Sequence, residues 1–327
     1  MRVFTGRRVQ INHLLISPDG RYLAAYGWAS SKPQTYAHVW RMGGDTNPLF
    51  ALTSDDPDRQ LSQVAFTPNS EHILSGIQGW WSSRHLLSGG VMAEEALTTL
   101  KPFVVSGDGR WAVSFGCDNE LGSLRLRVAE NEQSAWKERW SREFRYVPRT
   151  DAGRAISDNR ENFWTLWLSD NGTRLLLQFD TIRSHFAGGG RLIRVLDTAT
   201  GADVFSREET PKQITGQMVV GPVEQVLLLD GRAFHVVDPF KPGAPTLTRT
   251  NQSRLKITAA AFSPNGKLLA TTSNDTTVTM WDTATWQPTR QYGWEIGRLR
   301  AVAFAPDGLT CAAGSDIGKV VLFDVDG

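Results

Sequence analysis

Short apolar runs that end in a polar turn recur along the whole chain. The run "AAFSPNG" (260–266) is followed forty-two residues later by "VAFAPDG" (302–308). Earlier copies read "LLISPDG" (14–20), "VAFTPNS" (64–70), "FVVSGDG" (103–109) and "LWLSDNG" (166–172), and a degenerate copy reads "MVVGPVE" (218–224). The apolar run suits a buried strand, and Pro, Asp-Gly or Asn-Gly suits the tight turn that follows it. The pattern therefore predicts seven repeated units.

Each unit continues with further short strands. A second apolar run follows the turn, and a third is clearest in "VTMWDTATW" (278–286) and "VVLFDVDG" (320–327). In the second and third units, "RHLLS" (84–88) and "LRLRVAE" (124–130) are the best matches to this third strand. A more polar fourth strand then leads to the next unit. Four short antiparallel strands in roughly 40 to 50 residues are typical of a propeller blade.

The spacing of the turns predicts how the fold closes. The turns begin at positions 17, 67, 106, 169, 221, 263 and 305, and the last unit stops after its third strand. The segment "RVFTGR" (2–7) stands where the missing fourth strand belongs, and pairing it there removes an open sheet edge. The sequence thus predicts an all-β chain. It forms one domain over 1–327, a seven-bladed β-propeller of four-stranded antiparallel blades closed by the N-terminal strand.

The dipeptide Trp281-Asp282, at the end of "SNDTTVTMWD", carries a family resemblance. The chain resembles the WD-repeat propellers over essentially all of its length, and its punctuation is similar to that of bacterial members. The last two units match best, the first, fourth and fifth match in part, and the second and third match weakly. The resemblance implies a platform for protein–protein interaction that holds peptides at one mouth of the central channel.

The resemblance also implies a buried Asp-His-Ser-Trp hydrogen-bond network in each well-formed blade. Asp275, Ser273 and Trp281 match three of its members. The chain contains no histidine after His235, so neither of the two best blades can supply the fourth. We therefore expect the indole N–H of Trp281 to find another acceptor.

Composition narrows the function classes. The 35 basic and 34 acidic side chains nearly cancel, which gives no global argument for binding nucleic acid or an anionic membrane. Cys117 and Cys311 each lie in an apolar run, which predicts buried free thiols. The N-terminus lacks an apolar signal and no segment has transmembrane length, so we expect a cytoplasmic protein whose Asn171, Asn251 and Asn274 are not glycosylated.

Catalytic and metal-binding motifs are not found in the sequence. No two of the six histidines have the spacing of a metal pair, and no nucleophile or zinc motif occurs. The glycine-rich "AGGGR" (187–191) lies between strands and predicts a turn, and the acidic "SDDPD" (54–58) predicts a solvated loop. We therefore expect no cofactor, no metal and no enzymatic activity.

The residues eight and six positions before each turn proline, or its equivalent, enter the inner strands. In a propeller they ring one mouth of the channel. The set is rich in basic residues and contains no acid. With neighbouring side chains, the candidate site comprises Arg8, Gln10, Gln60, Lys101, Asn162, Trp164, Arg254, Lys256, Trp294, Arg298 and Arg300. The other members of the two sets are Asn12, Ser62, Thr99, Ile214, Gly216 and Thr258. Ordinary solvated loop ends are the alternative reading.

A second candidate surface is "SAWKERWSREFRYVPR" (134–149), within the longest gap between turns. Aromatic residues recur every four positions with arginines between them, a spacing that fits one face of a strand or a helix. The surface comprises Trp136, Arg139, Trp140, Arg142, Phe144 and Arg145. It fits either an outer strand whose aromatics pack on the blade or an exposed interface for a partner.

These observations favour a monomeric, non-enzymatic interaction platform. Its expected partner is a protein or peptide with an acidic or polar segment, with no nucleic acid and no membrane. Two alternatives stay open: a propeller enzyme of the lactonase or hydrolase type, and a small-ligand sensor that uses the same mouth. A catalytic version needs a metal or a general base at the mouth, and His13 is the only histidine next to the set.

Overall fold

A computed structural model of the chain describes most of its residues. The described ranges are 1–6, 9–28, 35–53, 61–77, 80–88, 91–95, 104–106, 108–118, 123–132, 135–145, 150–151, 154–155, 165–169, 172–181, 190–209, 217–222, 225–237 and 247–326.

The described strands form seven four-stranded antiparallel sheets and one two-stranded sheet. Each four-stranded sheet is named here by its first strand. The β2 sheet contains β2 (Gln10–Ile16), β3 (Tyr22–Trp28), β4 (Thr35–Arg41) and β5 (Phe50–Thr53). The β6 sheet contains β6 (Leu61–Phe66), β7 (His72–Ile77), β8 (Trp80–His85) and β9 (Val91–Glu95). The β10 sheet contains β10 (Val104–Val105), β11 (Trp111–Asp118), β12 (Ser123–Glu132) and β13 (Ala135–Arg145).

The remaining sheets repeat the same order. The β16 sheet contains β16 (Thr165–Leu168), β17 (Arg174–Thr181), β18 (Gly190–Asp197) and β19 (Asp203–Glu209). The β20 sheet contains β20 (Gln217–Val220), β21 (Val226–Asp230), β22 (Ala233–Val237) and β23 (Leu247–Thr250). The β24 sheet contains β24 (Ile257–Phe262), β25 (Leu268–Ser273), β26 (Thr277–Asp282) and β27 (Pro288–Gly293). The β28 sheet contains β28 (Leu299–Phe304), β29 (Thr310–Ser315), β30 (Lys319–Asp324) and β1 (Arg2–Thr5).

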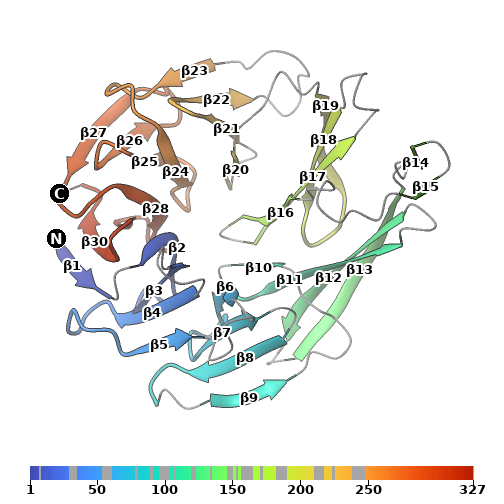
Figure 1. Cartoon of the computed structure of the whole chain (residues 1–327), viewed down its shortest axis with the longest axis horizontal. Coiled ribbons are helices and arrows are strands. Elements are labelled where there is room, and N and C mark those ends of the chain that lie inside the picture. The colour runs from blue at the N-terminus through green and yellow to red at the C-terminus, as the bar shows by residue number, and fades with distance from the viewer. Residues whose placement is uncertain are drawn as a thin grey trace.

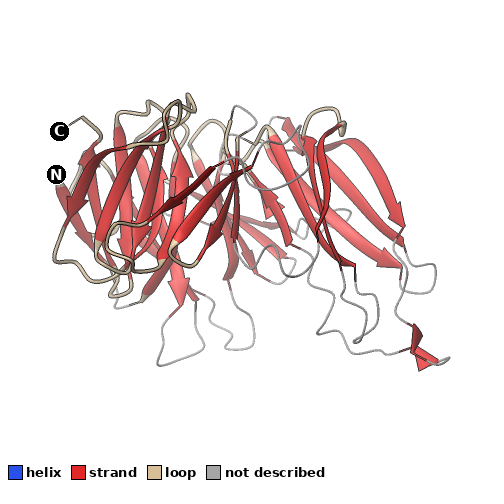
Figure 2. Ribbon diagram, turned by 90° about the horizontal axis from the view of Figure 1, so that it is seen from above, coloured by secondary structure: helices blue, strands red, loops and turns tan. Residues whose placement is uncertain are grey.

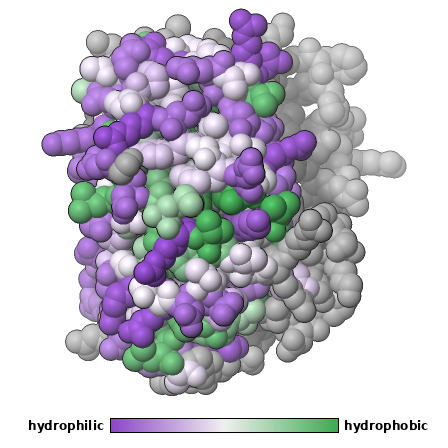
Figure 3. Space-filling view, turned by 90° about the vertical axis from the view of Figure 1, so that its left-hand side faces the viewer, coloured by the Kyte–Doolittle hydropathy of each residue, from purple (hydrophilic) through white to green (hydrophobic). Residues whose placement is uncertain are grey.

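The sheets follow one another around a common centre in chain order (Figure 1). The first strand of each sheet lies toward the centre and the fourth lies outside. The two-stranded sheet of β14 (Thr150–Asp151) and β15 (Arg154–Ala155) lies apart from the others (Figure 2). The outward side that carries the chain termini is largely hydrophilic, with a narrower hydrophobic band at mid-height (Figure 3). The all-β prediction is confirmed, and each of the seven predicted turns joins the first and second strands of one sheet.

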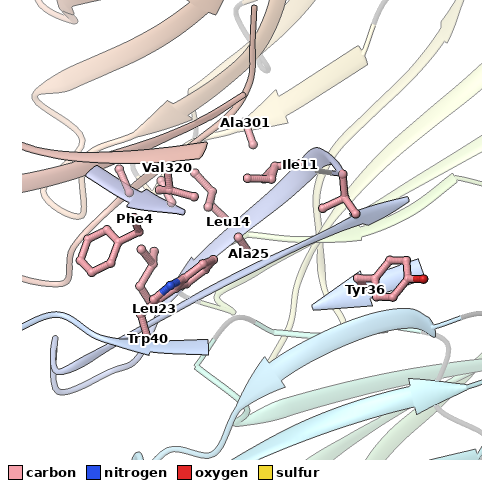
Figure 4. Close-up of a cluster of buried hydrophobic side chains, with 12 residues drawn as sticks. Phe4, Ile11, Leu14, Leu23, Ala25, Tyr36, Trp40, Ala301 and Val320 are labelled. Carbon is pink, nitrogen blue, oxygen red and sulfur yellow. The ribbon is translucent and has the colours of Figure 1, made fainter. Parts of the chain in front are cut away.

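The N-terminal strand completes the last sheet, as the sequence predicts. β1 pairs with β30 in antiparallel register, with Phe4 opposite Val320. Phe4 is fully buried in a core cluster with Ile11, Trp40 and Ala301, which come from the first and last sheets (Figure 4). Burial of a phenylalanine side chain contributes roughly 1.5–3 kcal/mol, so packing and strand pairing both join the two ends of the chain.

The third strand of the second unit differs from its prediction. The strand there is β8, which ends at His85, and the turn at 86–88 takes up the rest of "RHLLS". Leu86 is buried in that turn, which explains why an apolar residue there resembles a strand position. The prediction for the third unit is confirmed, because β12 contains all of "LRLRVAE".

Four inner strands carry a β-bulge at the same place. The pairing register of β2, β6, β24 and β28 skips one residue, and the skipped residues are Asn12, Ser62, Thr258 and Arg300. All four stand six positions before the turn proline. A bulge adds one residue to a strand and reverses which face the following side chains reach.

The bulge explains an apolar spacing that a regular strand cannot use. Leu299 and Val302 lie three positions apart, so strict alternation would place them on opposite faces. Both contact the same core cluster, which includes Ala270 and Val278 of the β24 sheet. The extra residue, Arg300, therefore lets both apolar side chains pack against the preceding sheet.

The prediction of buried free thiols is confirmed for one cysteine. Cys311 on β29 is fully buried and unpaired, and burial raises the pKa of its thiol. The side chain of Cys117 lies outside the described residues.

Candidate functional site

The structure describes six of the eleven residues predicted at the mouth. They are Gln10, Arg254, Lys256, Trp294, Arg298 and Arg300. The other five lie outside the described residues: Arg8, Gln60, Lys101, Asn162 and Trp164.

Five of the six described mouth residues lie at the starts of three inner strands, β2, β24 and β28, and Trp294 follows an outer strand. The hydroxyl of Thr258 on β24 donates to the carbonyl of Leu299 on β28, at 2.8 Å, so these two strands lie side by side. β28 in turn packs on β2, because Ala301 shares a core cluster with Ile11. On β2, the amide of Gln10 donates to the Asn12 side chain at 2.8 Å. The structure therefore brings the loop ends at Gln10, Lys256 and Arg298 to neighbouring strands.

Four cations gather at the start of β24 and β28. Arg254, Lys256 and Arg298 are exposed, and Arg300 is half-buried. Within the described part of the chain, none of the four forms an ion pair, and the Nε atom of Arg300 is buried with no hydrogen-bond partner. Unpaired cations at adjacent loop ends create a positive potential that attracts anionic groups.

The predicted set contains no acid, but the structure adds two from neighbouring turns. The Asp316 carboxylate accepts from the Arg298 backbone N–H at 3.0 Å. Asp275 lies beside the loop that carries Arg254, where Ser253 donates to it. Both carboxylates already accept hydrogen bonds, so they reduce the positive charge of the mouth without pairing with its side-chain cations.

Asn251 organises the loop before β24. Its side-chain amide lies 2.7 Å from the Ser273 hydroxyl, 3.0 Å from the Leu255 carbonyl and 3.2 Å from the Asp275 carboxylate. Burial would raise the pKa of Asp275, but hydrogen bonds from Ser253, Thr277 and Asn251 outweigh it and hold this pKa below its usual value.

Asn251 therefore contacts the Ser273 and Asp275 that sequence analysis placed in a network with a missing histidine. Asn251 was not predicted as a member of this network, because the family pattern has a histidine in that role. A side-chain amide donates hydrogen bonds as an imidazole N–H does, so asparagine can take the role of histidine here. The sequence signal for it was a polar side chain shortly before the apolar run of β24.

Trp281 finds a different acceptor, as expected. Its indole Nε1 donates to the Thr271 hydroxyl at 2.9 Å in the interior of the β24 sheet. In the β24 sheet, Trp281 pairs with Leu269, and Thr271 lies two residues further along the same strand. In the β2 sheet, Trp40 pairs with Leu23, and the residue two positions further along is Ala25, which has no hydroxyl. The Nε1 of the fully buried Trp40 accordingly has no hydrogen-bond partner among the described residues.

Trp294 packs between the outer strands of two sheets. It follows β27, the outermost strand of its sheet, and its ring stacks on Tyr292 at 5.9 Å between centroids. It also contacts Phe323 of the next sheet at 4.8 Å, and the Tyr292 hydroxyl donates to the Val325 carbonyl at 2.6 Å. Trp294 thus stabilises the outer seam between two sheets, and its membership of the mouth stays a prediction.

The aromatics of the second candidate surface do not share a face. In the pairing of β13 with β12, Arg139 is an extra residue between Trp140 and Glu138. Because this bulge reverses the alternation, Trp136 packs on the cluster shared with the β6 sheet, and Trp140 packs on the cluster shared with the β16 sheet. The expectation of a single aromatic face is wrong, and both described rings fill seams between sheets.

The polar residues of the same strand are also occupied. The Trp140 indole donates to the Thr198 carbonyl at 2.8 Å, and Arg142 pairs with Asp203 at 2.7 Å. Arg139 forms a salt bridge with Glu130 at 2.6 Å. These contacts favour blade packing over a free interface. The side chains of Phe144 and Arg145 lie outside the described residues.

His13 follows Asn12 of the predicted mouth set directly in the sequence. Its ring stacks on Tyr26 with centroids 4.5 Å apart, and the surrounding protein lowers its pKa by desolvation. A neutral imidazole adds no positive charge at pH 7. Among the described residues, no three histidine, cysteine or carboxylate side chains cluster as a metal site would require, and no helix is long and apolar enough to span a membrane.

Comparison with known proteins finds one repeat family. Residues 245–282, which contain β23, β24, β25 and β26 and the Asn251 network, match the family model "WD domain, G-beta repeat". The chain is also 28% identical over 133 residues to transducin beta-like protein 3 of Bos taurus. That similarity covers 40% of this chain and 17% of the relative. The chain thus carries a WD40 repeat and shows a distant similarity to a mammalian protein, which gives no support to a bacterial type.

Proposed function

We propose that the chain is a seven-bladed β-propeller that acts as a non-enzymatic platform for protein–protein interaction. In this proposal residues 1–327 form one domain that works as a monomer. It binds a peptide or protein segment with acidic or polar side chains at the mouth formed by the starts of β2, β24 and β28. The observation that carries the proposal is the group of exposed cations Arg254, Lys256 and Arg298, which have no ion-pair partner in the described structure.

The WD40 repeat over 245–282 supports this assignment, because WD40 repeat proteins commonly serve as interaction scaffolds. The matched repeat contains Arg254 and Lys256, so the similarity covers two of the three exposed cations. A scaffold role needs only a rigid surface with adaptable loops, and the loops between the sheets provide such a surface.

The chemistry of the mouth predicts an electrostatic mode of binding. Exposed cations attract an acidic segment over a Debye length of about 10 Å at 0.1 M salt, and the attraction weakens as salt rises. Such complementarity raises the association rate and selects against basic segments more than it raises affinity. Binding through this mouth should therefore weaken progressively between low and high salt.

The test is direct binding of a fluorescein-labelled oligoglutamate peptide, followed by anisotropy at two salt concentrations. The double substitution Arg298→Glu and Arg300→Glu should abolish binding while the circular dichroism spectrum stays unchanged. The matched control is Lys267→Glu, since this exposed lysine lies at the far end of the β24 sheet, in the turn between β24 and β25. Equal binding by the double variant and the wild type would reject the mouth as the site.

A further inference from the structure

The loop Asn251–Lys256, between β23 and β24, exposes an apolar side chain among the mouth cations. Leu255 is 48% exposed, one of few large hydrophobic side chains on the described surface. It stands directly between the exposed Arg254 and Lys256. An apolar residue flanked by two unpaired cations has the composition of an interface centre with a charged rim.

The backbone around Leu255 is held on both sides. Its N–H donates to the Ser253 hydroxyl at 3.3 Å, and its carbonyl accepts from the Asn251 amide at 3.0 Å. The Lys256 carbonyl accepts from the Asn274 backbone N–H at 3.0 Å. The loop is therefore tied to the turn between β25 and β26 and does not depend on a partner to order it.

Arg254 adds a conformational constraint. Its φ is 61°, in the left-handed region that a residue with a side chain rarely adopts. Its N–H donates to the Asn251 carbonyl at 3.0 Å, which closes the turn. Leu255 follows this closed turn directly and leads the chain into β24. Ordering entropy is a main cost of binding, so a preformed loop binds at a lower cost.

We propose that Leu255 is the apolar anchor of the mouth, and that the partner is an acidic segment carrying one large apolar side chain. This inference rests on the proposed function, because it uses the same cations to attract the acidic groups. Contact between the partner's apolar side chain and Leu255 removes apolar surface of both from water. We expect this contact to change the affinity about tenfold, the ratio that 1.4 kcal/mol produces.

Two labelled peptides test the proposal: glutamate peptides of equal length with either leucine or alanine at the centre. The wild-type protein should bind the leucine peptide about tenfold more tightly than the alanine peptide. Leu255→Ala should reduce this ratio to about one while leaving the alanine peptide's affinity unchanged. The matched control is Leu309→Ala, since Leu309 is 61% exposed in the turn between β28 and β29, at the opposite end of the β28 sheet from Arg298.

The outcomes separate the two proposals. A wild-type ratio near one, or a ratio that persists in Leu255→Ala, overturns the apolar anchor and leaves the cationic mouth standing if Arg298→Glu still weakens both peptides. If Leu309→Ala and Leu255→Ala both lose the preference for the leucine peptide to the same extent, the proposal that Leu255 is the apolar anchor is also overturned. Failure of the wild-type protein to bind either peptide overturns both proposals.

Discussion

Replacing Gly109 with alanine should destabilise the protein by far more than the same replacement at Gly20. Both glycines close the turn between the first and second strands of a sheet, and their φ angles are nearly equal, +68° and +73°. The left-handed backbone cost of about 1–2 kcal/mol therefore applies to both. The loss of unfolded-state entropy that favours alanine also applies to both, so these terms cancel in the comparison.

The two positions differ in what a new Cβ atom would meet. At Gly20 nothing lies within 4 Å. At Gly109 the Cβ would lie 1.8 Å from the Phe66 carbonyl oxygen and 2.9 Å from the Thr67 Cα, both backbone atoms of the preceding sheet. Carbon and oxygen approach no closer than about 3.3 Å, so the two sheets must separate by about 1.5 Å at this point.

Separation of packed backbone adds an overpacking cost of about 1–3 kcal/mol, and no side chain can rotate to relieve it. We therefore expect a loss of about 1–2 kcal/mol for Gly20→Ala and about 2–5 kcal/mol for Gly109→Ala. Urea unfolding followed by tryptophan fluorescence measures both, with the midpoint shifts compared at unchanged slope. Equal shifts for the two variants would refute the close approach of the turn to β6.

Three further predictions concern two core residues and the stability of the protein at low pH. Thr271→Val should lower the free energy of unfolding by about 1–2 kcal/mol, because the Trp281 N–H loses its acceptor, whereas Thr279→Val, opposite it on β26, should cost less in the same urea assay. Phe4→Ala should lower the free energy of unfolding by about 3–5 kcal/mol. It should also release β1 before any other strand, which hydrogen exchange detects as faster exchange of the backbone amides of residues 2–5. Since the pKa of Asp275 is lowered on folding, its contribution is present above about pH 4 and lost as pH falls through the folded pKa. Between pH 6 and pH 2, the urea midpoint of Asp275→Asn should fall less than the midpoint of the wild-type protein. An equal fall in the two proteins contradicts this prediction.

Much of the fold followed from local sequence. Each apolar run with its Pro-Asp-Gly or related turn marked one inner strand, because the turn chemistry and strand period act over a few residues. The unpaired end of the last unit predicted that the segment around Phe4 would return to it, and the pairing with Val320 shows that it does. The mouth prediction was partly informative for a similar reason. Arg254, Lys256 and Arg298 enter inner strands and remain exposed, since a loop end before a buried strand faces water.

Other features depended on the pairing register of the strands. A β-bulge shifts this register by one residue, so a strict two-residue alternation predicts the wrong face for the side chains beyond it. The bulge at Arg139 sends Trp136 and Trp140 to opposite neighbours, although their spacing of four predicted one face. The apolar pair at Leu299 and Val302, three positions apart, contained a readable signal for the inner-strand bulges. The three-residue spacing predicts a bulge only when irregular strands are considered as well as regular ones.

The sequence by itself determined the number of repeated units, the turn that begins each one and the strand that completes the last sheet. These are properties of short segments, whose backbone preferences and apolar period are written locally. Only the tertiary structure decided that Asn251 contacts Ser273 and Asp275 and that Trp294 belongs to a seam. Those contacts join residues from different turns and sheets, and their distances are fixed by sheet packing, which no local pattern encodes.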